Sequence, residues 1–414
     1  MSHYLTNVYN SEIYFRAAGI GQLLWKTVMV TETMCKKRKG SYIMVREVKI
    51  IAGTASKRLG DRIIEQFKRK EIIDQESDSA LYQLSPIEVK KFANDNTFVK
   101  LSESVREADV FLIQSSGAPV NDRLMELLIT IDACRRSSAG RINAIVPYFP
   151  YARSDKIDQP RVALTARLVA DLIQAAGADR VISMDLHVDQ IQGFFHLAFD
   201  HLKATSILAS YVEKNFLQGL SHDERRQEWV VVSPDAGAAK RAQAFATSLD
   251  LELAVILKQR SGNNDQSELM HVIGNVAGRK CIIIDDEIAT GGSLVNAINS
   301  LCENFGAKEA IAVATHGIFA NRAVRLIEEA HNLKAVVVTD TLDVPQINTM
   351  HQMSYLSGGV MVNEEILVTK IHECSVAELF AATIRAVHMG ESVTDIYERW
   401  NIARDKKNNY TDET

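Results

Sequence analysis

Residues 281–301 read CIIIDDEIATGGSLVNAINSL and carry the clearest signal of the fold class. Four apolar residues lead into two adjacent aspartates, and a Thr-Gly-Gly-Ser turn at 290–293 leads into a pattern of helical period. A strand, a glycine turn and a helix in this order are typical of α/β proteins. The stretch therefore predicts a buried strand whose carboxyl end leads into a ligand-binding loop.

The turn at 290–293 has the chemistry of an anion site. Gly291 and Gly292 let the backbone wrap closely around a ligand, and the first amides of the following helix point toward it. Thr290 and Ser293 add hydroxyl donors, and the upstream carboxylates could accept hydrogen bonds from vicinal hydroxyls or hold a metal. A purely structural turn with solvated acids is the alternative, which the apolar run before the aspartates disfavours. The pattern indicates a sugar phosphate as ligand.

Similar apolar runs recur along the chain and alternate with helical patterns, as at 122–140 and 166–177. Strands of continuous valine and isoleucine between helices predict mainly parallel sheets flanked by helices. The predicted strands are 48–53, 110–116, 142–149, 180–186, 229–234, 252–258, 281–287, 310–317 and 335–341.

The length predicts two α/β domains, since domains of about 150 residues are common. We place them at 46–203 and 204–389, with a seam near residues 200–226, where the stretch 214–229 is the most polar and loop-like in the middle of the chain. Residues 1–45 form an N-terminal extension of unknown role. We expect residues 390–404 to pack back on the first domain and 405–414 to form a flexible polar tail.

Composition excludes several classes of function. The chain is 46% hydrophobic and 24% charged with a formal net charge of −5, so we expect neither a disordered chain nor a nucleic-acid-binding protein. No apolar run approaches the roughly 20 residues that cross a bilayer, and the polar, acidic N-terminal stretch leads us to expect no secretory signal. The five scattered cysteines fit no disulfide or zinc framework. We therefore expect a cytoplasmic protein without a membrane partner.

The stretch 281–301 resembles the ribose-binding fingerprint of type I phosphoribosyltransferase folds, which include the transferases and the ribose-phosphate pyrophosphokinases. Other motifs are similar to the pyrophosphokinases and have no use in a simple transferase. The resemblance spans about residues 48–397 and implies two tandem type I phosphoribosyltransferase-like domains. The motifs are NDRLMELL (121–128), VPYFPYARSDK (146–156), SMDLHVDQIQGFF (183–195), VVSPDAGAAKRA (231–242) and THGIF (315–319).

Acidic residues and a histidine at strand ends predict a magnesium site. Asp185 and His187 are two residues apart, so they share a face of an extended chain, and Asp235 follows another predicted strand. Carboxylates and an imidazole near a triphosphate would hold Mg²⁺ directly or through water. The resemblance assigns the metal to His187 and Asp235, with Asp185 and Asp200 sometimes included. A buried core histidine is the alternative for His187.

The resemblance also implies an ATP site. Arg153 matches the ATP-contacting arginine of the family, and its guanidinium suits a phosphate or an adenine edge. Ser154 stands where the family usually has glutamine, followed by Asp155, and His187 is placed beside the nucleotide as well. A surface salt-bridge cluster is the alternative for the arginine and its neighbours.

A second segment, KKFANDNTF at 90–98, matches the family's adenine-contacting segment. Phe92 could stack on adenine, and Asn94 and Asn96 stand where aspartate and glutamate are common. An amide both donates and accepts hydrogen bonds, so adenine recognition can persist. In related enzymes a neighbouring subunit supplies this segment, which implies self-association into dimers or hexamers.

VILKQRSGNNDQSE at 255–268 begins as a predicted strand and continues into a Gly/Asn-rich loop. Lys258 and Arg260 match the catalytic lysine and arginine of the family's flexible loop. Two cations on a closing loop would stabilise the charge of a transferred phosphoryl group. A basic hairpin tip on the surface is the alternative.

Together these motifs predict an enzyme that transfers the diphosphoryl group of MgATP to the 1-hydroxyl of ribose 5-phosphate, forming 5-phosphoribosyl 1-diphosphate and AMP. Asp285, Asp286 and the loop 289–293 would bind the sugar phosphate, with Ala289 where many relatives have aspartate. One alternative is a catalytically silent regulatory subunit of such an enzyme. Another is a phosphoribosyltransferase that consumes the diphosphate and needs no ATP.

Overall fold

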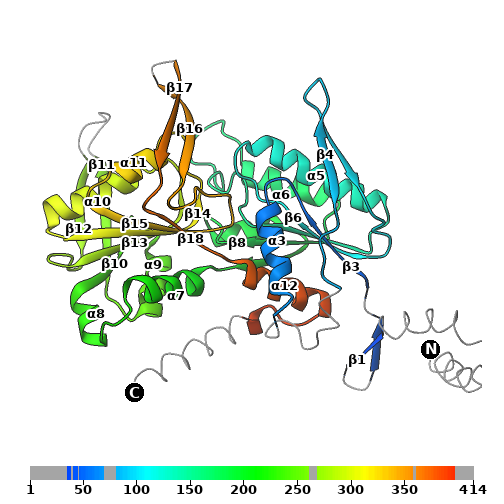
Figure 1. The fold of residues 1–414 in the computed structure, drawn as a ribbon, viewed down its shortest axis with the longest axis horizontal. Helices are drawn as coiled ribbons and strands as arrows, with labels where there is room; N and C mark the ends of the chain where they lie inside the picture. The colour runs from blue at the N-terminus through cyan, green and yellow to red at the C-terminus, as the bar shows by residue number, and fades with distance from the viewer. Residues whose placement is uncertain are drawn as a thin grey trace, which may run out of the picture.

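The computed structural model describes residues 35–38, 41–44, 46–69, 81–260, 268–357 and 360–396. Two sheets, each with helices packed against it, lie side by side along the long axis of the molecule (Figure 1). Two hairpins project from the same side of this body, one from each half (Figure 1). All the strands predicted above are present, with ends that shift by a few residues.

The first half is built on a five-stranded sheet in the order β3-β6-β7-β8-β9, and every neighbouring pair is parallel. All five residues of β6 are buried, because helices cover both faces of a parallel sheet. The strands are β3 (Val48–Ala52), β6 (Asp109–Ile113), β7 (Arg141–Val146), β8 (Arg180–Met184) and β9 (Ala198–Leu202). The helices are α3 (Lys57–Gln66), α5 (Val120–Arg136), α6 (Thr165–Ala176) and the 3₁₀ helix η1 (Asp189–Phe194).

The second half is built on a seven-stranded sheet in the order β12-β11-β10-β13-β14-β15-β18. Its pairs are parallel except β11 with β12. The strands are β10 (Trp229–Ser233), β11 (Leu253–Arg260), β12 (Glu268–Ile273), β13 (Lys280–Ile288), β14 (Glu309–Gly317), β15 (Leu333–Thr339) and β18 (Ile371–Cys374). The helices are α7 (Thr205–Phe216), α8 (His222–Glu228), α9 (Ala239–Leu249), α10 (Gly292–Phe305), α11 (Ala323–Glu329) and α12 (Ala377–Met389).

Three antiparallel hairpins were not predicted from the sequence. The projecting ones are β4 (Ile87–Lys91) with β5 (Thr97–Leu101), and β16 (Met350–Ser357) with β17 (Val360–Leu367). The third pairs β1 (Cys35–Arg38) with β2 (Ser41–Met44). The stretch 214–229, expected to be loop-like, is mostly helical, since Ser221 and Glu224 form a capping box that starts α8.

Helix α12 joins the two halves, because it packs on α3 of the first half. His388 Nδ1 lies 3.0 Å from the buried Asp109 carboxylate, and Arg141 donates to the Val387 carbonyl at 3.1 Å. One apolar cluster contains buried residues of both halves, Ile63 and Phe380 among them. No helix in the described parts of the chain combines the length and apolar composition needed to cross a membrane.

Candidate active site

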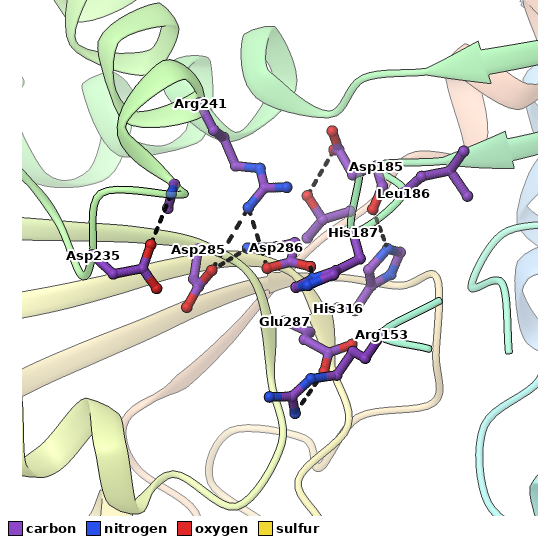
Figure 2. A network of polar contacts seen from close by, with 12 residues as sticks. Arg153, Asp185, Leu186, His187, Asp235, Arg241, Asp285, Asp286, Glu287 and His316 are labelled. Atoms are coloured by element: carbon purple, nitrogen blue, oxygen red, sulfur yellow. Dashed lines mark hydrogen bonds and ion pairs between the residues drawn. The ribbon is translucent and has the colours of Figure 1, made fainter. Parts of the chain in front are cut away.

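The two halves meet in a contact between a histidine and an aspartate. His187 follows β8 of the first sheet, and Asp286 lies on β13 of the second. The imidazole Nδ1 is 2.7 Å from Asp286 Oδ2 (Figure 2). The pairing of β10 with β13 ends at Ile283, so Asp285 and Asp286 extend beyond the neighbouring strand and are accessible to a partner from the other half. The contact brings together two of the predicted site residues.

Arg241, in the first turn of α9, bonds the same pair of aspartates (Figure 2). Its Nη1 lies 3.2 Å from Asp286 Oδ1 and 3.6 Å from Asp285 Oδ1. This arginine lies inside the motif VVSPDAGAAKRA, but no role was predicted for it from the sequence. An arginine in the first helical turn after a strand end is the signal that would have placed it at this edge of the sheet.

These contacts shift the pKa values within the cluster that His187, Asp285, Asp286 and Arg241 form. The hydrogen bond to Asp286 raises the pKa of His187 above its ordinary value, against the effect of burial. Burial alone would raise the pKa of Asp286, but its bonds to His187 and Asp285 and the charge of Arg241 hold that pKa well below the usual range. Burial and the Asp286 charge raise the pKa of Asp285. The contact between the two groups therefore shifts His187 toward its protonated form and Asp286 toward its charged form.

Glu287, the next residue of β13, is a site residue that the sequence analysis missed. Its side chain is buried, accepts a hydrogen bond from the Tyr148 hydroxyl at 3.2 Å, and lies 3.4 Å from Arg153 Nη1. Burial and the Asp286 charge raise the pKa of Glu287. The side chain of Arg153, which is 67% exposed, is thus held near the cluster while most of its surface faces solvent.

The predicted phosphate turn at 289–293 is open. Gly291 has φ 75° and is the N-cap of α10, and no side chain caps that helix. A Cβ at Gly292 would meet no atom within 4 Å. Thr290 and Ser293 are exposed. The Ala289 carbonyl accepts a hydrogen bond from the Ala320 amide at 2.9 Å, which attaches the turn to the loop after β14. The open amide end of a helix suits an anion.

The residues predicted to bind metal occupy different surroundings. Asp235 follows β10 and accepts from the Ala238 amide at 2.8 Å through Oδ1. Asp185 is buried and accepts through Oδ2 from Thr315 Oγ1 at 2.7 Å. Asp200 forms an ion pair with Arg180 at the start of β8, whereas His187 lies past the end of that strand. Within the described chain, His187 and Asp286 are brought into contact and Asp200 is not part of their cluster.

The predicted nucleotide residues lie in two places. Phe92, Asn94 and Asn96 form the tip of the β4–β5 hairpin, where Phe92 is 51% exposed and packs edge-on against Phe98 at 5.6 Å. The Phe92 amide donates to the Asn96 carbonyl at 2.9 Å, which closes the turn. The hairpin points away from the body of its own chain (Figure 1), and the structure describes no contact between it and the His187 cluster.

Ser154 and Asp155 lie in the long connection after β7, beside Arg153. The Ser154 amide donates to the Tyr151 carbonyl at 2.9 Å, and its carbonyl accepts from the Ala166 amide at 3.1 Å, so this turn is anchored to α6. Arg153 reaches the cluster through Glu287, as described above.

Lys258 and Arg260 lie on β11, where their backbones pair with Met270 and Glu268 of β12. Their side chains and residues 261–267 lie outside the part of the chain that the structure describes. The predicted catalytic role of these two residues therefore stays a prediction.

Comparisons with known proteins agree with this architecture. The model of the N-terminal domain of ribose phosphate pyrophosphokinase matches residues 48–177, and that of the phosphoribosyl transferase domain matches 200–345. Two α/β halves with mainly parallel sheets define the molecule as a tandem protein of phosphoribosyltransferase type, as predicted. The chain belongs to the ribose-phosphate pyrophosphokinase family, and the predicted family and enzyme class are confirmed.

The similarity extends over most of the chain. A ribose-phosphate pyrophosphokinase of Caldanaerobacter subterraneus subsp. tengcongensis is 42% identical over 84% of this chain and 98% of its own length. One from Clostridium tetani is 38% identical over 86% of this chain and 100% of its own. The crystal structure of phosphoribosylpyrophosphate synthetase from Mycobacterium smegmatis aligns with a TM-score of 0.69 and 38% identity, covering 83% of this chain and all of that one.

Proposed function

We propose that this chain transfers a diphosphoryl group from ATP to ribose 5-phosphate at the edge where the two halves meet. The 1-hydroxyl oxygen attacks the β-phosphorus of ATP, the bond from that phosphorus to the α–β bridging oxygen breaks, and AMP leaves. The hydroxyl proton passes to solvent. The observation behind the proposal is the contact at 2.7 Å between His187 and Asp286, which lies on the strand that leads into the open glycine turn.

In this proposal the second half binds the acceptor. The phosphate lies in the turn 289–293, held by amides at the start of α10 and by the Thr290 and Ser293 hydroxyls. Asp285, whose side chain is 40% exposed, accepts hydrogen bonds from the sugar hydroxyls. Asp286 is already bonded to His187 and Arg241, so it holds the edge of the acceptor site in place. Fixing the acceptor supplies much of the rate enhancement.

The first half binds the donor. Arg153 is held by Glu287 with most of its side chain exposed, which suits a phosphate contact. Ser154, Asp155 and His187 would contact the same side of the bound nucleotide. Lys258 and Arg260 on β11 would supply positive charge to the transferred group.

We propose Mg²⁺ as the cofactor, because an imidazole and a carboxylate, those of His187 and Asp235, are available as ligands. The described residues contain no group of three or more histidine, cysteine or acidic side chains that could hold a metal. Mg²⁺ takes few protein ligands and completes its shell with phosphates and water, so His187 and Asp235 can suffice. Asp185 and Asp200 fit less well, since Thr315 and Arg180 respectively engage their carboxylates. When bound, Mg²⁺ would neutralise charge on the phosphates.

The active form is proposed to be a homo-oligomer, a dimer or a hexamer. The tip of the β4–β5 hairpin exposes Phe92 and points away from its own chain (Figure 1), so Asn94 and Asn96 would contact adenine in a neighbouring subunit. The domain division at 46–203 and 204–389 is proposed on the same basis as in the sequence analysis. The cytoplasmic location also stays a prediction.

Release of AMP from ATP by the purified chain tests the function. We expect AMP formation that requires ribose 5-phosphate, and Lys258→Ala should lower kcat by at least about 10²-fold, since a cation that stabilises the transition state is lost. No AMP would support the silent regulatory subunit. Pyrophosphate released with a nucleobase and without ATP would support the phosphoribosyltransferase. Unchanged activity of Lys258→Ala would remove the catalytic role of this lysine.

Mixing two impaired variants tests the shared site. Phe92→Ala and Asp286→Asn impair different parts of the molecule, so a mixed oligomer contains some sites in which both residues are intact. We expect the mixture to release AMP faster than either variant does alone. Failure to recover, with mixed oligomers confirmed by native mass spectrometry, would place Phe92 and Asp286 in the same chain's site.

A further inference from the structure

The backbone just before His187 adopts a conformation that most residues avoid. Asp185 has φ 40°, in the left-handed region that favours glycine. Such a conformation costs free energy and persists only where the surroundings fix it. Asp185 lies two residues before His187, so its conformation sets the direction in which the imidazole leaves the end of β8.

The segment from the end of β9 to the start of α7 fixes this turn from one side. The Asp185 amide donates to the Leu202 carbonyl at 2.9 Å, and its Oδ2 accepts from the Ala204 amide at 2.8 Å. The Leu186 amide donates to His201 Nε2 at 2.9 Å. These three bonds tie residues 185 and 186 to the end of β9 and the start of α7.

The second half fixes the same turn from the other side. Asp185 Oδ2 also accepts from the Thr315 hydroxyl of β14 at 2.7 Å. The adjacent His316 is buried, and its Nε2 lies 3.1 Å from the Met184 carbonyl and 3.3 Å from the Asp185 carbonyl (Figure 2). Carbonyls only accept, so Nε2 carries the proton, and Nδ1 can accept from Thr341 Oγ1 at 2.9 Å.

We propose that Thr315 and His316 are positioning residues, which act through Asp185 to hold His187 against Asp286. In this role the Asp185 carboxylate is a structural acceptor, not a metal ligand: it is 4% exposed, and one of its oxygens already accepts two hydrogen bonds. The inference rests on the proposed function for its effect on rate. It adds to that function a set of bonds through which the second half shapes a segment of the first.

Replacing one hydroxyl tests the proposal. Thr315→Val keeps the shape of the side chain and leaves Asp185 one hydrogen bond short. We expect kcat for AMP release to fall at least about tenfold, since small displacements of catalytic groups are costly, while KM for ribose 5-phosphate stays within about twofold. Thr315→Ser restores the hydroxyl and should recover most of kcat.

Thr383→Val is the matched control. Thr383 is as buried as Thr315, and its hydroxyl donates to the Leu379 carbonyl at 2.8 Å inside α12, away from the turn. We expect Thr383→Val to lower the melting temperature as much as Thr315→Val does, with kcat near that of the wild type. The proposal is overturned if Thr315→Val keeps its kcat, if Thr315→Ser stays as slow as Thr315→Val, or if the control loses as much kcat.

A measurement without turnover separates this proposal from the proposed function. The imidazole signals of ¹⁵N-histidine-labelled protein, assigned with His187→Gln, report the bond of His187 to Asp286. We expect these signals to move in Thr315→Val and to stay in place in Thr383→Val. Signals that stay unchanged in Thr315→Val would reject the positioning role even in an active enzyme. An absence of AMP formation by the wild type would reject the proposed function alone.

Discussion

The loop after β8 and the turn after β13 lie at corresponding ends of parallel strands, yet they differ in whether protein groups bond their polar atoms. At residues 185–186, backbone and carboxylate groups are bonded from both halves. At residues 289–293, the hydroxyls are exposed and the helix start has no side-chain cap. The comparison shows that one kind of strand end can serve as a rigid support or as an open binding turn, depending on whether protein or ligand supplies the partners.

The largest effect should come from the residue that links the two regions. Asp286→Asn removes the charge that faces His187 and Arg241, so we expect kcat to fall by about 10²–10³-fold. The pKa of His187 should also fall toward its ordinary value, because the bond to Asp286 is what raises it. Steady-state kinetics and histidine NMR titration measure the two effects.

Asp250→Asn is the control for that substitution. Asp250 also pairs with an arginine and a histidine, Arg226 and His222, but on the surface. Its loss should leave kcat within about twofold, since exposed ion pairs contribute little. An Asp286→Asn enzyme that keeps more than a tenth of wild-type kcat would contradict the link between the halves.

A smaller effect should come from filling the open turn. Gly292→Ala adds a methyl group where no protein atom lies within 4 Å, so folding should tolerate it. The methyl would occupy space proposed for the phosphate, and we expect KM for ribose 5-phosphate to rise about tenfold, equivalent to roughly 1.4 kcal/mol. The melting temperature should stay within about 2 °C.

Gly193→Ala is the matched substitution outside the turn, since a Cβ there also meets nothing within 4 Å. It should change neither KM nor the melting temperature. Equal KM values for Gly292→Ala and the wild type would show that the phosphate lies elsewhere.

The last effect concerns the loop after β8, and we expect it in the stability of the protein and not in its activity. Burial and the nearby charge of Lys203 lower the pKa of His201 to about 4, below the ordinary value of 6.5. The unfolded chain therefore binds the extra proton first, and the free energy of unfolding falls as the pH drops from 6.5 toward 4. Between pH 7 and pH 5 we expect a loss of about 2 kcal/mol from this residue.

Urea unfolding of the wild type and of His201→Gln measures this contribution. The glutamine oxygen can still accept from the Leu186 amide, but the side chain does not titrate. His316, whose pKa burial also lowers, contributes to both proteins and cancels in the difference. Equal losses in the two proteins would mean that His201 is protonated in the folded state at pH 5.

The sequence predicted the strands and the strand-end residues, because runs of valine and isoleucine and the acids that follow them are local signals. It did not predict which groups meet. His187 and Asp286 are 99 positions apart, and Arg241 reaches them from a third segment. Glu287 was not predicted because the recognisable motif consists of the two aspartates before it. Alternation along β13 nevertheless places Glu287 on the same side as Asp285.

The projecting hairpins were missed for another reason. The exposed residues of β4, Glu88 and Lys90 among them, leave no continuous apolar run, and the strands are held by pairing within the hairpin. In 214–229, polar composition suggested a loop, but the capping box of Ser221 and Glu224 stabilises a short exposed helix. In both cases, local hydrogen bonding determines structure that hydrophobic patterning does not reveal.

The packing of α12 on α3 has a consequence for synthesis of the protein. The apolar faces of Ile63 and Phe67 are covered by a helix that leaves the ribosome more than 300 residues later, and the buried Asp109 receives His388 only then. A nascent chain that has completed the first sheet therefore exposes part of its core to solvent. Early release or truncation before residue 377 would leave an N-terminal half with exposed apolar surface and with Asp109 lacking its His388 partner. Such a fragment is a natural substrate for chaperones and proteases.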